Sequence, residues 1–344
     1  MQQVNRQFLL RERPTGLVQR SNFDFVEVPL PELAEGEALI RTLYLSLDPT
    51  NRIWMSDVPQ YMPPVALGEV MRGAGIGQVV LTRSRRFAVG DLVTGLVGWQ
   101  DYVVAREDAP FPFHHIPQGL PLPLSTLMGT LGMTGLTAYF GLLECAPPRP
   151  GETVVVSAAA GAVGSIVGQI AKLKGCRAVG LAGSHEKCKL LVDELGYDAA
   201  VCYKDADWKQ QLSAACPSGI DVNFENVGGE LMDAVVDRMN LHGRIALCGL
   251  ISGYNAGQRS RGNWDAILMK RITVRGFIIT DFLPRFGEAA AALATWLIEG
   301  QLKHKETVVE GLEHAPETLN RLFAGQNVGK LMIKVADPAV ALGP

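Results

Sequence analysis

A short turn rich in small residues is the part of this sequence whose residue types and spacing best support chemistry. A β-branched run from Thr153 to Ser157 is followed by Ala-Ala-Ala-Gly-Ala-Val-Gly-Ser and then by an apolar helical segment over 166–173. Strand, tight turn and helix in this order form the context of the dinucleotide fingerprint G-x-G-x-x-G. Ala159, Gly161 and Gly164 take its three small-residue positions, with alanine in place of the first glycine.

These residue types suit a bound pyrophosphate. Gly161 lets the backbone approach the anion closely, and Gly164 lets the helix lie against the strand. The N–H groups at the helix N-terminus attract negative charge. We therefore expect this turn, with Ala162 and Val163 between the two glycines, to bind a dinucleotide. The alternative is a turn that packs a helix on a sheet and binds nothing.

The end of the next predicted strand, over 177–183, indicates which dinucleotide. A site that prefers NAD has Asp or Glu about twenty residues beyond the turn, where it bonds the ribose 2′-hydroxyl. Here Gly183 and Ser184 hold that place, and Lys187 follows one turn later. Serine can donate to a 2′-phosphate and lysine can neutralise it, so the sequence predicts NADP(H). The alternative is that Lys187 is only a solvated helix residue.

Composition limits the class of protein. With 344 residues the chain should hold about two domains. The net charge of -3 gives no reason to expect a nucleic-acid partner. No apolar run reaches the length of a membrane helix, and the first residues lack the layout of a signal peptide, so we expect a cytoplasmic protein with no membrane partner.

Cysteine and histidine patterns give no metal signal. The six cysteines show no C-x-x-C spacing, and the six histidines show no H-E-x-x-H pattern. His114 and His115 are adjacent, but neighbouring side chains of an extended segment point to opposite faces. The sequence therefore predicts no catalytic zinc and no other metal.

Two kinds of segment follow each other along the chain. Residues 1–125 are mostly short strands separated by Gly and Pro, which is typical of a compact β-rich domain, and 124–143 should form two helical pieces that lead into the second domain. From 151 to about 300, strands alternate with helices, as in a doubly wound parallel sheet. The predicted strands are 7–10, 23–28, 37–46, 75–81, 91–94, 102–105, 153–157, 177–183, 199–203, 220–225, 244–249, 272–279, 306–310 and 330–335, and later helices are 205–215, 230–240, 285–300 and 315–324.

Ligands of such sheets bind beyond the carboxyl ends of the strands. That rule places Tyr203, Asn226 and Gly249 beside the cofactor. The last two predicted strands, 306–310 and 330–335, have no obvious place in the parallel sheet. We expect them to return to the first domain.

Several motifs together resemble the zinc-independent medium-chain dehydrogenase/reductases. The similarity is to the branch of leukotriene hydroxydehydrogenase/prostaglandin reductase, plant alkenal reductases and bacterial curcumin reductase, and it runs nearly end to end. The motifs are AAAGAVGSIVG at 158–168, GSHEK at 183–187, ENVGG at 225–229, YN at 254–255, GWQDY at 98–102 and GQNVGK at 325–330.

This resemblance implies a fold and an activity. It implies an α/β protein with a GroES-like domain over 1–125, completed by 305–344, and a Rossmann NADPH-binding domain over 126–304. It implies a homodimer formed through the strand 272–279. The implied reaction is NADPH-dependent reduction of the carbon–carbon double bond in α,β-unsaturated ketones and aldehydes.

The resemblance also assigns residues. It implies that Lys187 holds the 2′-phosphate, that Tyr203 and Asn226 line the adenosine and diphosphate, that Asn327 reaches the nicotinamide, and that Tyr254 lies over the substrate. The family commonly has Asp-Pro-Tyr-Met-Arg near residue 50, whereas this chain has Asp-Pro-Thr-Asn-Arg. We therefore expect a pocket that differs from the family's at Thr50.

Hydride transfer to an enone builds negative charge on the carbonyl oxygen, so the site needs a hydrogen-bond donor there. Tyr254 is the predicted donor, and the alternative is that it is only an aromatic wall. Two other functions stay open. One is reduction of quinones by NADPH, and the other is NADPH binding without catalysis.

Overall fold

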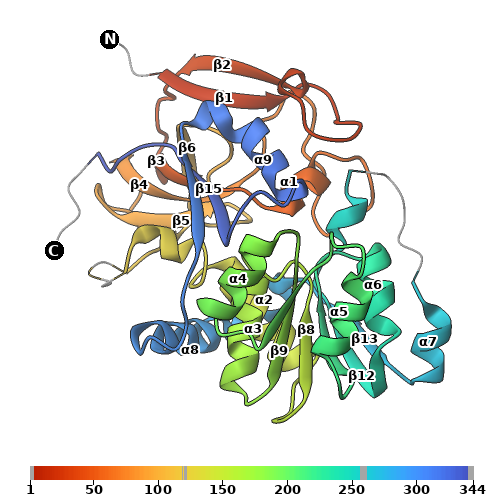
Figure 1. The fold of residues 1–344 in the computed structure, drawn as a ribbon. Coiled ribbons are helices and arrows are strands. Elements are labelled where there is room, and N and C mark those ends of the chain that lie inside the picture. The colour runs from red at the N-terminus through yellow and green to blue at the C-terminus, as the bar shows by residue number, and fades with distance from the viewer. Residues whose placement is uncertain (1–3, 118, 120–121, 256–261, 340–344) are drawn as a thin grey trace. The chain divides into compact units, whose positions relative to one another are not determined.

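The computed structural model describes residues 4–117, 119, 122–255 and 262–339, and the chain forms two compact units (Figure 1). The first unit comprises Met1–Ser125, Val308–Gln326 and Leu331–Pro344. The second comprises Thr126–Thr307 and Asn327–Lys330. No helix among the described residues is both long and apolar enough to cross a membrane.

The first unit is built on a seven-stranded mixed sheet in the order β14-β15-β3-β4-β5-β7, with β6 paired to β3. A separate two-stranded sheet joins β1 to β2. Strand β15 pairs with β3, so the end of the chain lies beside N-terminal strands. The elements are β1 Val4–Leu10, β2 Phe23–Pro29, β3 Glu37–Ser46, α1 Pro49–Trp54, β4 Ala74–Thr82, β5 Leu92–Leu96, β6 Tyr102–Arg106, β7 His114–His115, β14 Glu306–Glu310, α9 Ala315–Phe323 and β15 Lys330–Lys334.

The second unit is a six-stranded parallel sheet in the order β10-β9-β8-β11-β12-β13 (Figure 1). Counted along this unit, that is the order 3-2-1-4-5-6 of the doubly wound dinucleotide-binding fold. The predicted fold class is therefore confirmed. The elements are α2 Met133–Phe140, β8 Thr153–Val156, α3 Gly164–Leu173, β9 Arg177–Ala182, α4 His185–Asp193, β10 Ala199–Cys202, α5 Trp208–Ala215, β11 Ile220–Glu225, α6 Gly229–Val236, β12 Met239–Leu247, α7 Trp264–Met269, β13 Thr273–Gly276 and α8 Phe286–Ile298.

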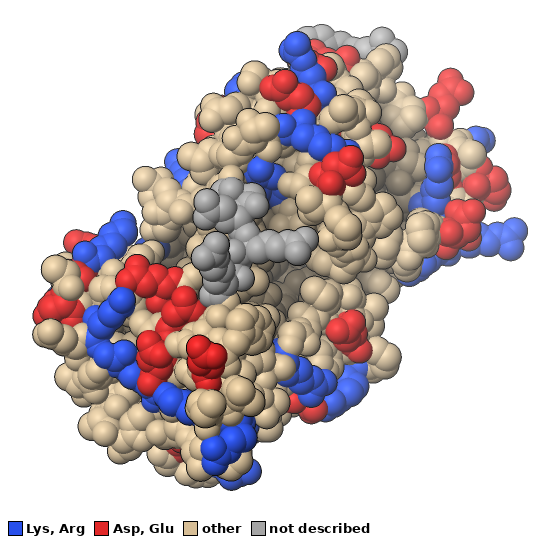
Figure 2. Space-filling model, turned by 90° about the vertical axis from the view of Figure 1, so that its right-hand side faces the viewer, with Lys and Arg blue, Asp and Glu red and all other residues tan. Residues whose placement is uncertain are grey.

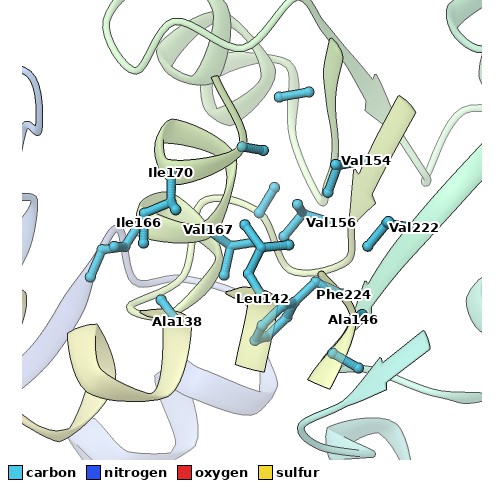
Figure 3. Packing of buried hydrophobic residues seen from close by; sticks show 14 of the residues in the cluster. Ala138, Leu142, Ala146, Val154, Val156, Ile166, Val167, Ile170, Val222 and Phe224 are labelled. Atoms are coloured by element: carbon cyan, nitrogen blue, oxygen red, sulfur yellow. The ribbon is translucent and has the colours of Figure 1, made fainter. Parts of the chain in front are cut away.

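Strand β8 is buried on both faces because its valines alternate between two cores. Val154 and Val156 belong to the cluster that includes Val167 and Ile170 of α3 (Figure 3). Val155 points to the opposite cluster, which includes residues of α5 and α6. Side chains of a strand point alternately to its two faces, so an uninterrupted β-branched run fits a central parallel strand.

Two glycines of α3 allow the helix to lie close to its neighbours. A Cβ added to Gly164 would lie 2.5 Å from the carbonyl oxygen of Ala158, and one added to Gly168 would lie 1.9 Å from Cζ of Tyr197. The Tyr197 hydroxyl donates a hydrogen bond to the carbonyl oxygen of Gly164 at 2.6 Å. Burial raises the pKa of Tyr197, so the phenol remains a donor.

Replacing Gly168 by alanine should lower the free energy of unfolding by about 1–3 kcal/mol, because the methyl group overlaps the buried Tyr197 ring. Urea denaturation measures this change. The matched control is Gly287→Ala in α8, where an added Cβ meets nothing within 4 Å and alanine should favour the helix. Equal stability of the two variants would contradict this packing.

Some element boundaries differ from the sequence prediction. Strand β12 begins at Met239, well before the predicted start at 244. Strand β13 ends at Gly276, before its predicted end at 279, and a 3-10 helix follows over Ile279–Arg285. The sequence analysis also missed α1, whose six residues are too few to show a helical period. Its start carries a local signal, since Pro49 is its first residue and Asp48 and Asn51 form a capping box around it.

Candidate active site

The predicted dinucleotide turn joins β8 to α3. Ala158 adopts a left-handed conformation with φ of 48°, which is unfavourable for a residue with a Cβ. The Ala159 N–H donates to the Leu181 carbonyl oxygen of β9 at 3.0 Å, and the Gly161 N–H donates to Ala158 at 2.9 Å. Ala162 and Val163 complete the turn before α3 begins at Gly164. Backbone hydrogen bonds within the turn and to β9 thus hold its conformation.

A segment near the C-terminus also holds this turn. The Gly329 N–H donates to the Ala160 carbonyl oxygen at 2.8 Å, and Gly161 and Gly329 form a parallel β-bridge. The Asn327 side-chain amide is buried and donates to the Gly329 carbonyl oxygen at 3.0 Å. The structure therefore brings the predicted residue Asn327 beside the predicted turn, a contact that the sequence did not reveal.

A buried carboxylate organises the end of β11. Oε1 of Glu225 accepts hydrogen bonds from Ser157 Oγ at 2.8 Å and from the N–H groups of Val227 at 2.7 Å and Gly228 at 2.8 Å. Its Oε2 accepts from Asn223 Nδ2 at 2.9 Å. Glu225 is fully buried, and these four donors satisfy both of its carboxylate oxygens. In the sequence, Glu225 stood out only as part of the motif ENVGG, and no role was predicted for it.

Asn226 joins the two central strands. Its N–H donates to Ser157 Oγ at 2.8 Å, and its Nδ2 donates to the Ser157 carbonyl oxygen at 2.7 Å. Ser157 directly follows β8, and Asn226 directly follows β11. The strand order changes direction between these two strands, which is where dinucleotides bind in such sheets.

The residues predicted to recognise a 2′-phosphate lie after β9 and β10. Lys187 is half-buried, and burial, followed by the nearby charge of Lys204, lowers its pKa. The Tyr203 N–H donates to the Ala182 carbonyl oxygen at 3.1 Å, and a Cβ on Gly183 would lie 2.7 Å from the Tyr203 hydroxyl. Burial raises the pKa of Tyr203, so its hydroxyl remains a donor. Lys204 is a further cation that the sequence analysis did not single out.

Ser184 has a structural role in this corner. Its hydroxyl oxygen caps α4 by accepting a hydrogen bond from the Lys187 N–H at 3.3 Å. The exposed Glu186 has its pKa lowered by its own backbone N–H and then by the Ser184 hydroxyl. Donation from Ser184 to a phosphate therefore stays a prediction.

A pocket of about 410 Å³ opens beside the ends of β12 and β13. It is lined by Gly249, Leu250, Tyr254, Phe277 and Ile278, among others. The Leu250 N–H donates to the Tyr254 hydroxyl oxygen at 3.1 Å. This bond withdraws electron density from the phenol and makes its O–H a stronger donor.

Thr50 belongs to the first unit, whereas the other predicted site residues belong to the second. Thr50 lies in α1, and its hydroxyl is hydrogen-bonded to that of Tyr61. The neighbouring Arg52 is buried and donates to the carbonyl oxygens of Gly16 at 3.0 Å and Pro14 at 2.8 Å. Burial lowers the pKa of Arg52, whose contacts are those of a structural residue. A role for Thr50 with substrate stays a prediction.

Comparisons with known proteins agree with this architecture. A family model described as an N-terminal domain of oxidoreductase matches residues 6–112, and one described as a zinc-binding dehydrogenase matches residues 162–295. The chain is 46% identical over 338 residues to a putative NADP-dependent oxidoreductase, YfmJ, of Bacillus subtilis, covering 97% of this chain and 98% of that protein. It is 43% identical over 341 residues to the NADPH-dependent curcumin reductase of Escherichia coli, with coverage of 97% and 98%.

A solved structure is similar over nearly the whole chain. The crystal structure of CurA in complex with NADPH from Vibrio vulnificus matches with a TM-score of 0.92 and 44% identity, covering 97% of this chain and 100% of that one. Fold and turn together define a two-unit oxidoreductase with a dinucleotide-binding sheet. The chain belongs to the medium-chain dehydrogenase/reductases, in the zinc-independent branch that includes the curcumin and prostaglandin reductases.

Proposed function

We propose that this protein uses NADPH to reduce the carbon–carbon double bond of α,β-unsaturated ketones and aldehydes. The cofactor assignment rests on one observation, a half-buried Lys187 beside Lys204 and Tyr203 at the strand ends where an NAD site would carry an acid. The 43% identity to a curcumin reductase supports the substrate class, since curcumin is an enone.

The residues of this chain have separate tasks in the proposed reaction. The turn from Ala159 to Gly164 and the ends of β8 and β11 would seat the diphosphate. Asn327, held beside that turn, would contact the nicotinamide end. NADPH supplies the hydride to the β-carbon, and the apolar pocket beside Tyr254 would receive the substrate.

Tyr254 is proposed as the donor to the carbonyl oxygen, where charge develops. Tyr254→Phe should lower kcat with an enone by about 10²-fold, the usual cost of losing one such donor, with little change in KM for NADPH. Steady-state NADPH oxidation gives both constants. Tyr139→Phe is the control, because Tyr139 bonds to Glu288 of α8. If Tyr254→Phe kept full kcat, Tyr254 would line the pocket but would not donate a hydrogen bond in the reaction.

The overall activity is tested by NADPH consumption with a panel of enones, enals and quinones. We expect turnover with enones and enals, and weak turnover with quinones. Faster consumption with quinones would favour the quinone reductase alternative. NADPH binding without consumption on any substrate would favour the non-catalytic alternative.

We also propose that two copies pair along β13. This strand is an edge of the parallel sheet and is largely exposed. The adjoining helix α7 exposes Trp264 to 69%, Leu268 to 67% and Met269 to 67%, more apolar surface than a short helix usually leaves in water. A second sheet edge and a second α7 would cover both features.

The double variant Trp264→Glu with Leu268→Glu should therefore convert a dimer into a monomer, because it places charges in an apolar contact. Analytical ultracentrifugation measures the mass. Leu81→Glu, an exposed site on β4 of the first unit, should leave the mass unchanged. A native protein that already sediments as a monomer would contradict the proposed pairing.

A cytoplasmic location is proposed from the cysteines. All six are free thiols, which suits a reducing compartment. On the face drawn in Figure 2, acidic and basic side chains are interspersed. This face offers no broad basic surface for nucleic acid.

A further inference from the structure

A histidine, a cysteine and an aspartate from two connections of the second unit lie together. His185 is the first residue of α4, Cys202 is the last of β10, and Asp205 follows in the β10–α5 connection. One potential ligand atom from each lies within 4.8 Å of the others. Among the residues that the structure describes, this is the only such group of three or more His, Cys, Asp or Glu side chains.

The distance between the histidine and the aspartate matches that of a tetrahedral metal site. Zinc–ligand bonds of about 2.0–2.3 Å place nitrogen and oxygen ligands about 3.3 Å apart and put sulfur about 3.6 Å from either. Nε2 of His185 lies 3.2 Å from Oδ1 of Asp205, so this edge already has the required length. The Cys202 sulfur lies within 4.8 Å of both ligand atoms, so it needs to approach each by at most about 1.2 Å.

Asp205 is held in place for this arrangement. Its other carboxylate oxygen, Oδ2, accepts a hydrogen bond from Gln211 Nε2 of α5 at 3.1 Å. The Asp205 N–H donates to the Cys202 carbonyl oxygen at 3.1 Å, which closes the turn between the two residues. Such outer contacts orient metal ligands and are typical of built sites.

The three ligand side chains also differ in their exposure to solvent. Cys202 is 4% exposed, whereas the His185 side chain is 75% exposed and can admit an ion from solvent. The nearby ammonium groups of Lys187 and Lys204 oppose a bound cation. Their effect is offset because the ion would displace the thiol proton, and the resulting thiolate with the Asp205 carboxylate balances a charge of +2.

We propose that His185, Cys202 and Asp205 bind zinc or another thiophilic divalent cation, with water in the fourth position. A nitrogen, sulfur and oxygen donor set favours such an ion over magnesium or calcium. This departs from the sequence prediction of no metal, because the three residues lack any metal-binding spacing along the chain. The ion would cross-link the connection after β9 to the connection after β10. It would take no part in hydride transfer.

The test uses the full-length protein stripped of metal with a chelator. Calorimetric titration should show one zinc ion per chain, and titration with Co²⁺ should give the near-ultraviolet charge-transfer band of a thiolate ligand. Cys202→Ser should abolish the band, and Asp205→Asn should weaken zinc binding at least tenfold. His115→Ala is the matched control, because His115 and Asp91 form a similar pair at 3.5 Å without a cysteine.

Two results would overturn the proposal: no zinc binding, or a Co²⁺ band that survives Cys202→Ser. In the second case, loss of the band in Cys188→Ser would assign the thiolate to Cys188 instead. Cys188 serves as the comparison because its thiol lies near Cys202; burial and then that neighbour raise its pKa to about 11. None of these measurements uses NADPH or an enone. A failure here therefore leaves the proposed reductase activity untouched.

Discussion

Replacing Lys187 by alanine should weaken NADPH binding about 10- to 100-fold and leave NADH binding nearly unchanged. A hydrogen bond from an ammonium to a phosphate contributes about 1.5–3 kcal/mol, and 1.4 kcal/mol is a factor of about ten. Lys187 is half-buried and its pKa is lowered by burial and by Lys204, so its charge is poorly solvated before the phosphate arrives. Fluorescence titration with each coenzyme gives the two dissociation constants.

The pH dependence separates this role from a general loss of folding. Because the phosphate prefers protonated Lys187, NADPH affinity of the native protein should fall as pH rises through the lowered pKa of Lys187. Lys187→Ala should lack that fall. Lys189→Ala changes an exposed lysine of the same helix and should bind NADPH normally. An unchanged NADPH constant in Lys187→Ala, or a native preference for NADH, would refute the cofactor assignment.

Replacing Glu225 by leucine should lower the free energy of unfolding by about 3–5 kcal/mol and weaken NADPH binding. Four donors, on Ser157, Asn223, Val227 and Gly228, would lose their acceptor, and a buried donor costs about 1–3 kcal/mol when left unpaired. Loss of these hydrogen bonds would also make the end of β11 less rigid, and the diphosphate should bind there. Urea denaturation and NADPH titration measure the two effects.

Glu225→Gln provides the matched control for this prediction. The amide oxygen can take the place of Oε1 and keep its three donors. The NH₂ group of the new glutamine then faces the Asn223 side chain. The buried Oδ1 of Asn223 has no hydrogen-bond partner among the described residues. If the Asn223 amide flips, this Oδ1 can accept a hydrogen bond from the glutamine NH₂. Glu225→Gln should thus retain most stability and NADPH affinity. If Glu225→Leu unfolded no more easily than Glu225→Gln, the carboxylate would not organise this strand end.

The sequence predicted the sheet because its signals are local. The valines of β8 and the small residues before α3 are consecutive, so strand, turn and helix can be read within twenty residues or so. The structural role of Glu225 was missed for a different reason. A carboxylate at a strand end usually lies in solvent, and Ser157, its partner, is 68 residues away.

The same limit explains the other residues that sequence reasoning missed. Tyr61 meets Thr50 through a loop with no regular period, so nothing in the sequence joins them. His185 and Cys202 belong to different strand–helix connections, which only the order of β9 and β10 makes neighbours. Lys204 could have been found, because it directly follows Tyr203. Tyr203 had already been predicted to lie beside the cofactor, since ligands bind beyond the carboxyl ends of the strands.

The bond between Gly329 and Ala160 has a consequence for exchanging parts between relatives. The coenzyme-binding unit is assembled from two separate stretches, Thr126–Thr307 and Asn327–Lys330. A chimera that transplants only the long stretch would combine a foreign turn with the host's own Gly329 segment. Full coenzyme affinity should therefore be kept in such chimeras only when both pieces are swapped together.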